Sequence, residues 1–177
     1  MTVSNTNIIL LAGANPRNRE WLHQLAGYLK SHEIESEIFP YLHWDNQTEI
    51  DIKNEICRFK EYIKSLEPTI VIAKSAGAII GMNAVLNGAA VDKMVIIGLP
   101  VAYMAEKRID VNQLISSISV PTLCIQASKD PMGNYHEVNE LCSRQPLIEV
   151  VKVTAADHAY TDLTSVVRNI ETFIHDS

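Results

Sequence analysis

The sequence has little positive charge, little glycine and no hydrophobic run long enough to span a bilayer. Its 177 residues include 15 lysines and arginines against 21 aspartates and glutamates, a formal net charge of −6. Because phosphate groups are bound by basic side chains, this balance argues against nucleic acids and anionic membrane surfaces as partners. The charge-free stretch Ser75–Val91 contains Asn83 and Asn87, and it is too short and too polar for a transmembrane helix.

Cysteine is scarce as well. The three cysteines, Cys57, Cys124 and Cys142, are widely spaced and form no C-x-x-C pattern. This count argues against a disulfide framework or a cysteine-based zinc site, and it favours a reducing compartment. The first basic residue, Arg17, comes after an apolar run, so a secretory signal with a basic start is not expected. We therefore expect a cytoplasmic protein that needs no metal.

The chain does contain enough apolar residues for a sizeable core. Hydrophobic residues make up 47% of the chain and charged residues 20%, which suits one domain over residues 1–177. Short runs rich in isoleucine and valine have the length of strands, and four of the six are apolar nearly throughout, as expected of strands covered on both faces. These runs are 8–11, 34–39, 69–73, 94–98, 122–127 and 148–153.

Longer stretches between these runs predict helices. They lie at about 19–30, 48–65, 76–87, 111–117, 135–141 and 163–174. The third is apolar on almost every side, so we expect it to be buried. Six strand–helix pairs predict an α/β fold, a doubly wound, mostly parallel sheet with helices on both faces. Ligands bind such sheets beyond the carboxyl ends of the strands, so polar residues that follow strands are the candidate site.

A serine follows the third predicted strand, in the segment Ala-Lys-Ser-Ala-Gly at 73–77. A serine on a sharp strand-to-helix turn between small residues is the G-x-S-x-G arrangement of a nucleophile, here with alanine in the first glycine position. Alternatively, Ser75 only caps the following helix. No P-loop or dinucleotide-binding glycine pattern is present. We expect the neighbouring Lys74 to face solvent, with contact to an anionic substrate as the alternative.

A nucleophilic serine needs a base and a group that orients the base. In hydrolases on this kind of sheet the chain order is serine, acid, histidine. Asp130 follows the fifth predicted strand and His158 follows the sixth, so order and position both fit. Asp130 is also a good turn residue beside a proline, and His158 can simply belong to the start of the last helix. Asp157 and Asp110 are the next candidates for the acid.

Four segments together resemble the α/β-hydrolase family. They are Leu-Leu-Ala-Gly-Ala at 10–14, the serine segment at 73–77, Pro-Thr-Leu-Cys-Ile-Gln-Ala-Ser-Lys-Asp-Pro at 121–131, and Asp157-His158. The resemblance covers essentially the whole chain, and within the family it is greatest to short dienelactone-hydrolase-like proteins. It implies one hydrolase domain, with six strands in the order 2-1-3-4-5-6 and no cap domain, because only about twenty residues separate the fourth and fifth strands.

The resemblance also implies how an oxyanion would be held. By the family pattern, the backbone N–H groups of Ala14 and Ala76 would bind it, and these roles use the main chain only. Two positions depart from the pattern: the family's His-Gly after the first strand is Ala12-Gly13 here, and the first glycine of the serine turn is Ala73. Neither departure removes a reacting group.

Without a cap, we expect a shallow, open site. Large side chains that follow strand ends are candidates for its walls, with ordinary packing as the alternative. They are Tyr41, His43, Trp44, Tyr103, Met104 and Met132.

The sequence therefore predicts a serine hydrolase with Ser75, Asp130 and His158 as its triad, acting on a small carboxylic ester or thioester. No metal or organic cofactor is implied, the expected partner is a small acyl substrate, and the chain is expected to be a monomer or homodimer. One alternative is a non-catalytic binding or scaffold protein that keeps the fold. Another is an acyl transferase or peptidase with the same triad.

Overall fold

Six strands form one sheet in the computed structural model, which describes residues 6–46, 48–66 and 69–175. All neighbouring strands are parallel, and their order is β2-β1-β3-β4-β5-β6. This confirms the predicted fold class and strand order. The strands are β1 (Asn7–Leu11), β2 (Glu37–Ile38), β3 (Thr69–Lys74), β4 (Lys93–Ile97), β5 (Thr122–Ala127) and β6 (Ile148–Val153).

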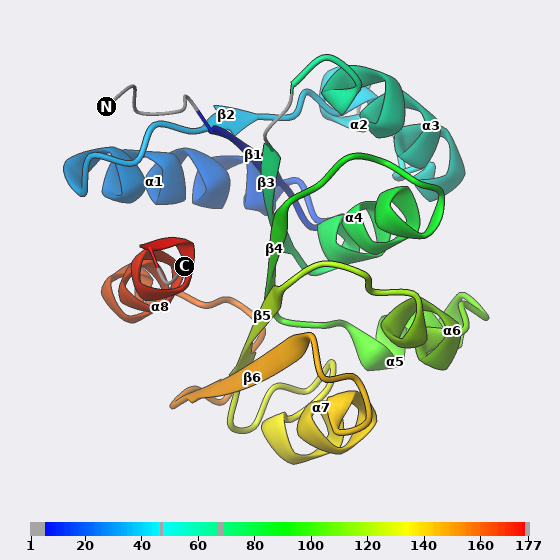
Figure 1. The fold of residues 1–177 in the computed structure, drawn as a ribbon, viewed down its shortest axis with the longest axis vertical. Helices are drawn as coiled ribbons and strands as arrows, with labels where there is room; N and C mark the ends of the chain where they lie inside the picture. Colours follow the sequence, from blue (N-terminus) through cyan, green and yellow to red (C-terminus); the bar gives the residue numbers. More distant parts are fainter. Residues whose placement is uncertain (1–5, 47, 67–68, 176–177) are drawn as a thin grey trace.

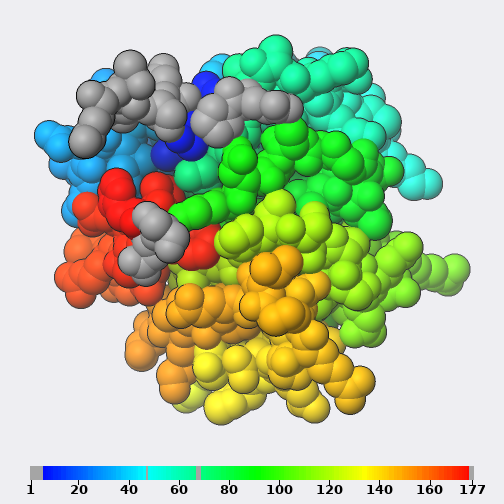
Figure 2. All heavy atoms as spheres, in the orientation of Figure 1, coloured from blue at the N-terminus to red at the C-terminus, as the bar shows by residue number. Residues whose placement is uncertain are grey.

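Helices cover both faces of the sheet. Helices α1 and α8 lie on one face, and the helices from α3 to α7 lie on the other (Figure 1). The first and last helices lie side by side, with α8 in red next to the blue of α1 (Figures 1 and 2), and His32 bonds to Glu171 at 3.1 Å between them. The helices are α1 (Arg17–Ser31), α2 (Leu42–Asn46), α3 (Ile52–Ile63), α4 (Ala76–Leu86), α5 (Val101–Glu106), α6 (Val111–Ser116), α7 (Tyr135–Cys142) and α8 (Leu163–His175).

Helix α4 is the buried helix that its apolar sequence predicts. Nearly all its residues are buried, and it packs on β1, β3 and β4. Gly77 is required for this packing, because a Cβ at this position would lie 2.7 Å from the Ala12 carbonyl oxygen and 2.8 Å from that of Leu11. The close approach sets the first turn of α4 directly beside the end of β1.

The prediction was wrong about the second strand and about two short helices. The run 34–39 forms a strand only at Glu37–Ile38, which pairs with β1 at one edge of the sheet. No helix was predicted at 42–46 or at 101–106, where the structure has α2 and α5. Helices this short have too few residues to show a repeating apolar pattern.

The predicted absence of a cap domain holds, since residues 98–121 form only α5, α6 and their connections. Within the three described stretches of the chain, none of the helices combines the length and apolarity that crossing a bilayer requires.

Candidate active site

Ser75 lies on the turn between β3 and α4. Its backbone has φ 54° and ψ −121°, a region that non-glycine residues rarely adopt. The residue stands at the N-cap position of α4, yet its side chain makes no capping hydrogen bond. Instead, Oγ lies 2.8 Å from Nε2 of His158. The strained turn therefore presents the hydroxyl to the histidine, and the capping alternative is wrong.

Three residues far apart in the sequence form a continuous chain of hydrogen bonds here. His158, in the loop after β6, has Nδ1 2.7 Å from Oδ2 of Asp130, which follows β5. With Asp130 ionised, Nδ1–H donates to the carboxylate, and Nε2 is left to accept the Ser75 hydroxyl proton. The carboxyl ends of β3, β5 and β6 thus bring together the three side chains that the sequence singled out.

Asp130 is buried, and both of its oxygens accept further hydrogen bonds. Oδ1 accepts from the Met132 backbone N–H at 2.8 Å, and Oδ2 accepts from the Tyr160 hydroxyl at 2.8 Å. Burial and the neighbouring Asp130 raise the pKa of Tyr160 well above its usual value, so the phenol remains a donor at neutral pH. Sequence reasoning missed Tyr160; its position two residues after His158 was the only available signal.

The other acid candidates take no part. Asp157 is exposed, and its carboxylate accepts from the Ala159 N–H at 2.9 Å. Asp110 caps α6 by accepting from Gln113 N–H. Both side chains have the ordinary role of an aspartate at a turn or a helix start.

Gly98 directly follows β4 and lies against the rings of His158 and Tyr160. Its φ is +69°, and a Cβ there would lie 2.6 Å from Cε2 of Tyr160 and 2.9 Å from Cε1 of His158. Any side chain at this position would displace both rings. The absence of a Cβ is what lets the loop after β6 reach across β4 and β5 toward Ser75.

Lys74 was expected to face solvent, and this is wrong. Its side chain is buried, and the ammonium donates to Oδ1 of Asn18 and to the carbonyl oxygen of His158, both at 3.1 Å. Nζ also lies 5.3 Å from the centre of the Trp21 ring and 5.8 Å from that of Tyr160. Burial lowers the pKa of Lys74 to about 8, although Asp130 and Asp157 partly oppose the shift. The last residue of β3 points to the α1–α8 face, and the loops there close over it.

The two predicted oxyanion residues flank the serine. Ala76 is the first residue of α4, where backbone N–H groups have no acceptor within the helix. Ala14 follows Gly13, whose missing Cβ would lie 3.1 Å from Cβ of Ser75. In the part of the chain that the structure describes, neither N–H donates a hydrogen bond. Both are free to bind an oxyanion, and that role stays a prediction.

Most of the predicted wall residues are elsewhere. Tyr41, His43 and Met104 are buried in or against the core, where Tyr41 donates to the Ala12 carbonyl at 3.1 Å and packs edge-on against His43. His43 lies in α2 and Tyr41 directly precedes this helix, so neither ring faces the solvent side of the site. Trp44 and Met132 are half-buried. Of the six predicted wall residues, Tyr103 is the one that lines the cavity beside Ala14 described below.

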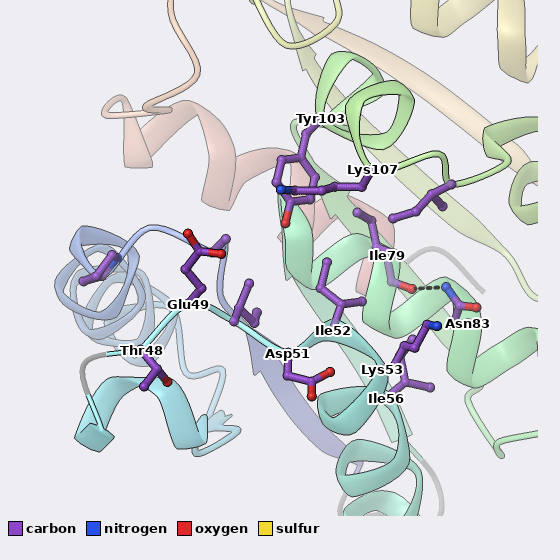
Figure 3. Close-up of a pocket in the computed structure, with 14 residues that line it drawn as sticks. Thr48, Glu49, Asp51, Ile52, Lys53, Ile56, Ile79, Asn83, Tyr103 and Lys107 are labelled. Carbon is purple, nitrogen blue, oxygen red and sulfur yellow. Dashed lines mark hydrogen bonds between the residues drawn. The ribbon is translucent and has the colours of Figure 1, made fainter.

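A cavity of about 950 Å³ opens beside Ala14 (Figure 3). It lies between the segment 48–56, α4 and the region of α5. Its lining residues are Ala14, Pro16, Thr48, Glu49, Ile50, Asp51, Ile52, Lys53, Ile56, Ile79, Asn83, Tyr103, Lys107 and Ile109. Residues of α3 and α5 thus form walls of a cavity next to the predicted oxyanion residue Ala14, whereas Ser75, Asp130 and His158 do not line it. Among the described residues, no three histidine, cysteine or carboxylate side chains cluster in a way that could hold a metal ion.

Comparison with known proteins places this site in context. A family model for an alpha/beta hydrolase domain matches residues 5–176. Comparison with curated protein sequences finds no significant match.

Solved structures with the same fold include three of bacterial and archaeal origin. An esterase from Pyrococcus furiosus superposes with a TM-score of 0.76 at 16% identity, covering 97% of this chain and 81% of that one. Naproxen esterase from Bacillus subtilis gives 0.75 at 13% identity, with 97% and 85% covered. A lipase-esterase related protein from Clostridium acetobutylicum gives 0.78 at 14% identity, with 97% and 95% covered. At these identities the likeness establishes the fold alone.

Proposed function

The chain belongs to the alpha/beta hydrolase family, and from that premise we propose that it is a serine hydrolase that cleaves a small carboxylic ester or thioester. The observation that carries this proposal is the unbroken hydrogen-bond chain from the Ser75 hydroxyl through His158 to the buried Asp130. The esterases among the structures of the same fold are consistent with it. The narrower resemblance to dienelactone-hydrolase-like proteins stays a prediction.

The reaction follows from the positions of these groups. Ser75 Oγ attacks the substrate carbonyl carbon while His158 Nε2 takes the hydroxyl proton, and the buried Asp130 stabilises the resulting imidazolium. The N–H groups of Ala14 and Ala76 donate to the oxyanion of the tetrahedral intermediate. The intermediate collapses when His158 returns the proton to the leaving alcohol or thiol, which leaves an acyl group on Ser75. Water then attacks this acyl group with His158 as base, and His158 returns the proton to Ser75 Oγ as the carboxylic acid is released.

Labelling with a fluorophosphonate probe tests whether the chain has an activated serine. Wild-type protein should react with the probe under native conditions and should not react after heat unfolding. Ser75→Ala should abolish labelling, whereas Ser143→Ala, at the end of α7 where the hydroxyl only bonds the Glu140 carbonyl, should label normally. A wild-type protein that takes no label would favour a binding or scaffold protein. Label that survives in Ser75→Ala would place the nucleophile elsewhere.

Substrate profiling separates the hydrolase from the transferase and the peptidase. Para-nitrophenyl esters, coenzyme A thioesters and peptide amides should be compared in water and with added alcohol or amine acceptors. Release of free acid, unaffected by acceptors, is the expected result. Formation of a new ester or amide in preference to free acid would indicate an acyl transferase with the same triad.

A further inference from the structure

The cavity beside Ala14 has an apolar interior and a charged rim. Five isoleucines line it, of which Ile79 is buried and the others are half-buried. The charged lining residues are all exposed: Glu49, Asp51, Lys53 and Lys107. Figure 3 shows the apolar side chains of Ile52 and Ile79 between the segment 48–56 and α4. A cavity with an apolar interior and a charged rim is suited to binding an apolar group of a ligand.

The cavity adjoins the reacting centre at Ala14, and it also contacts α4, the helix that begins directly after Ser75. Ala14, the predicted oxyanion donor, is at one end, and Ile79 and Asn83 stand one and two turns along the helix that begins after Ser75. At 1.5 Å per residue, Asn83 is about 12 Å further along α4 than Ser75. A group attached to the carbonyl carbon at Ser75 would reach the cavity past Ala14 and extend along α4.

The position of His158 decides whether the acyl group or the leaving group of the substrate enters the cavity. His158 Nε2 must protonate the leaving oxygen or sulfur, so the leaving group has to lie on the side of the loop 154–162. None of the cavity's lining residues comes from that loop; they come from the segment after β1, from 48–56, from α4 and from 103–109. With the leaving group on the His158 side and the oxyanion between Ala14 and Ala76, the acyl chain points into the cavity.

The residues that line the cavity also restrict which functional groups the acyl chain can have. Among the described residues that line the cavity, the basic ones are Lys53 and Lys107, and both are exposed at the rim and not buried where a second carboxylate would lie. The Asn83 amide is already engaged as a donor to the Ile79 carbonyl at 2.8 Å (Figure 3). A saturated chain advances by about 1.25 Å per carbon. Roughly eight to ten carbons therefore span the distance of about 12 Å between Ser75 and Asn83 along α4.

We propose that this cavity binds the acyl chain, and that the substrate is an ester or thioester of an uncharged, linear fatty acid of medium length. This inference rests on the proposed hydrolase function and adds the class of acyl group to it. Each methylene that enters the cavity leaves water, which is worth up to about a fourfold gain in kcat/KM. The gain should end where the cavity ends.

The experiment is kcat/KM for para-nitrophenyl esters from acetate to myristate. The expected result is a rise with chain length to a maximum at octanoate or decanoate, followed by a plateau or a fall. Ile56→Trp should fill the cavity and lower the octanoate-to-acetate ratio at least about tenfold. Leu86→Trp is the matched control, since Leu86 is exposed on α4 outside the cavity and should leave the whole profile unchanged.

The outcomes separate the two hypotheses. Acetate hydrolysis that depends on Ser75, with no gain for longer chains, overturns the acyl-chain cavity and leaves the hydrolase intact. If kcat/KM rises with acyl-chain length but Ile56→Trp does not reduce this rise, the acyl chain binds outside this cavity and the proposal is wrong. If Ile56→Trp does not fold, Ile109→Trp on the opposite wall gives the same test. No hydrolysis of any ester and no fluorophosphonate label would instead defeat the proposed function itself.

Discussion

The Tyr160 hydroxyl donates a hydrogen bond to Oδ2 of Asp130 at 2.8 Å, the same oxygen that accepts from His158. The phenol oxygen also accepts from the Ala127 N–H at 3.0 Å, and the Tyr160 carbonyl accepts from the Trp21 indole at 3.0 Å. Tyr160 therefore connects the loop that carries the histidine to β5 and to α1. These contacts hold Asp130 and His158 in one arrangement before any substrate arrives.

Replacing Tyr160 by phenylalanine should lower turnover more than it affects substrate binding. The variant keeps the ring but removes one donor to Asp130 and leaves the buried Ala127 N–H without an acceptor, which costs about 1–3 kcal/mol of stability. We expect kcat to fall about tenfold, with KM little changed. Steady-state kinetics and urea unfolding check both effects. The matched control is Tyr28→Phe on the exposed face of α1, and equal kinetics for the two variants would contradict the positioning role.

Asp130→Asn should be much more damaging. The amide cannot stabilise the imidazolium of His158 and favours the wrong tautomer, so kcat should fall by about 10³- to 10⁴-fold with the fold retained. Asp110→Asn is the control, because asparagine caps a helix as well as aspartate does. Near-normal ester turnover in Asp130→Asn would move the role of the acid to another residue.

Gly98→Ala should disturb the histidine, whereas Gly27→Ala should not. A Cβ at Gly98 overlaps the rings of Tyr160 and His158 in a backbone with φ +69°, so we expect stability to fall by about 1–2 kcal/mol or more and kcat to fall with it. Gly27 lies within α1 with open space around its missing Cβ, and alanine there should stabilise by up to about 1 kcal/mol. Urea unfolding and ester turnover of both variants provide the comparison, and a fully active Gly98→Ala would count against this reading of the loop.

Lys74 should make stability depend on pH in the alkaline range. Its pKa of about 8 in the folded protein is below the ordinary 10.5, so between these pH values the unfolded chain binds the additional proton. The free energy of unfolding should therefore rise with pH over this range, by at most about 1.4 kcal/mol per unit.

The comparison with Lys74→Met isolates this effect, because the tyrosines and cysteines that titrate nearby remain in both proteins. Urea unfolding at pH 7, 8, 9 and 10 should show the wild type gaining stability relative to the variant above pH 8. Parallel curves for the two proteins would mean that Lys74 is not held in a buried site with a lowered pKa.

The strands and the serine turn were predictable because their signals are local. Strands β3, β4 and β5 are covered on both faces, so each appears as a mostly apolar run. Ser75 stands between such a run and an apolar helix. The edge strand β2 has only two residues, which are too few to show a repeating pattern. Asp130 and His158 could be found by their order along the chain, but their distances to one another could not.

The sequence by itself determined the fold class, the strand order through the family resemblance, and the residue types available at each strand end. Only the tertiary structure decided that Lys74 is buried, that Tyr160 bonds Asp130, that Tyr41 and His43 pack inward, and that a cavity opens beside Ala14. Each of these depends on residues from separate elements meeting in space. A local pattern reports which face of its own element is apolar, and it contains no information about the partner that covers that face.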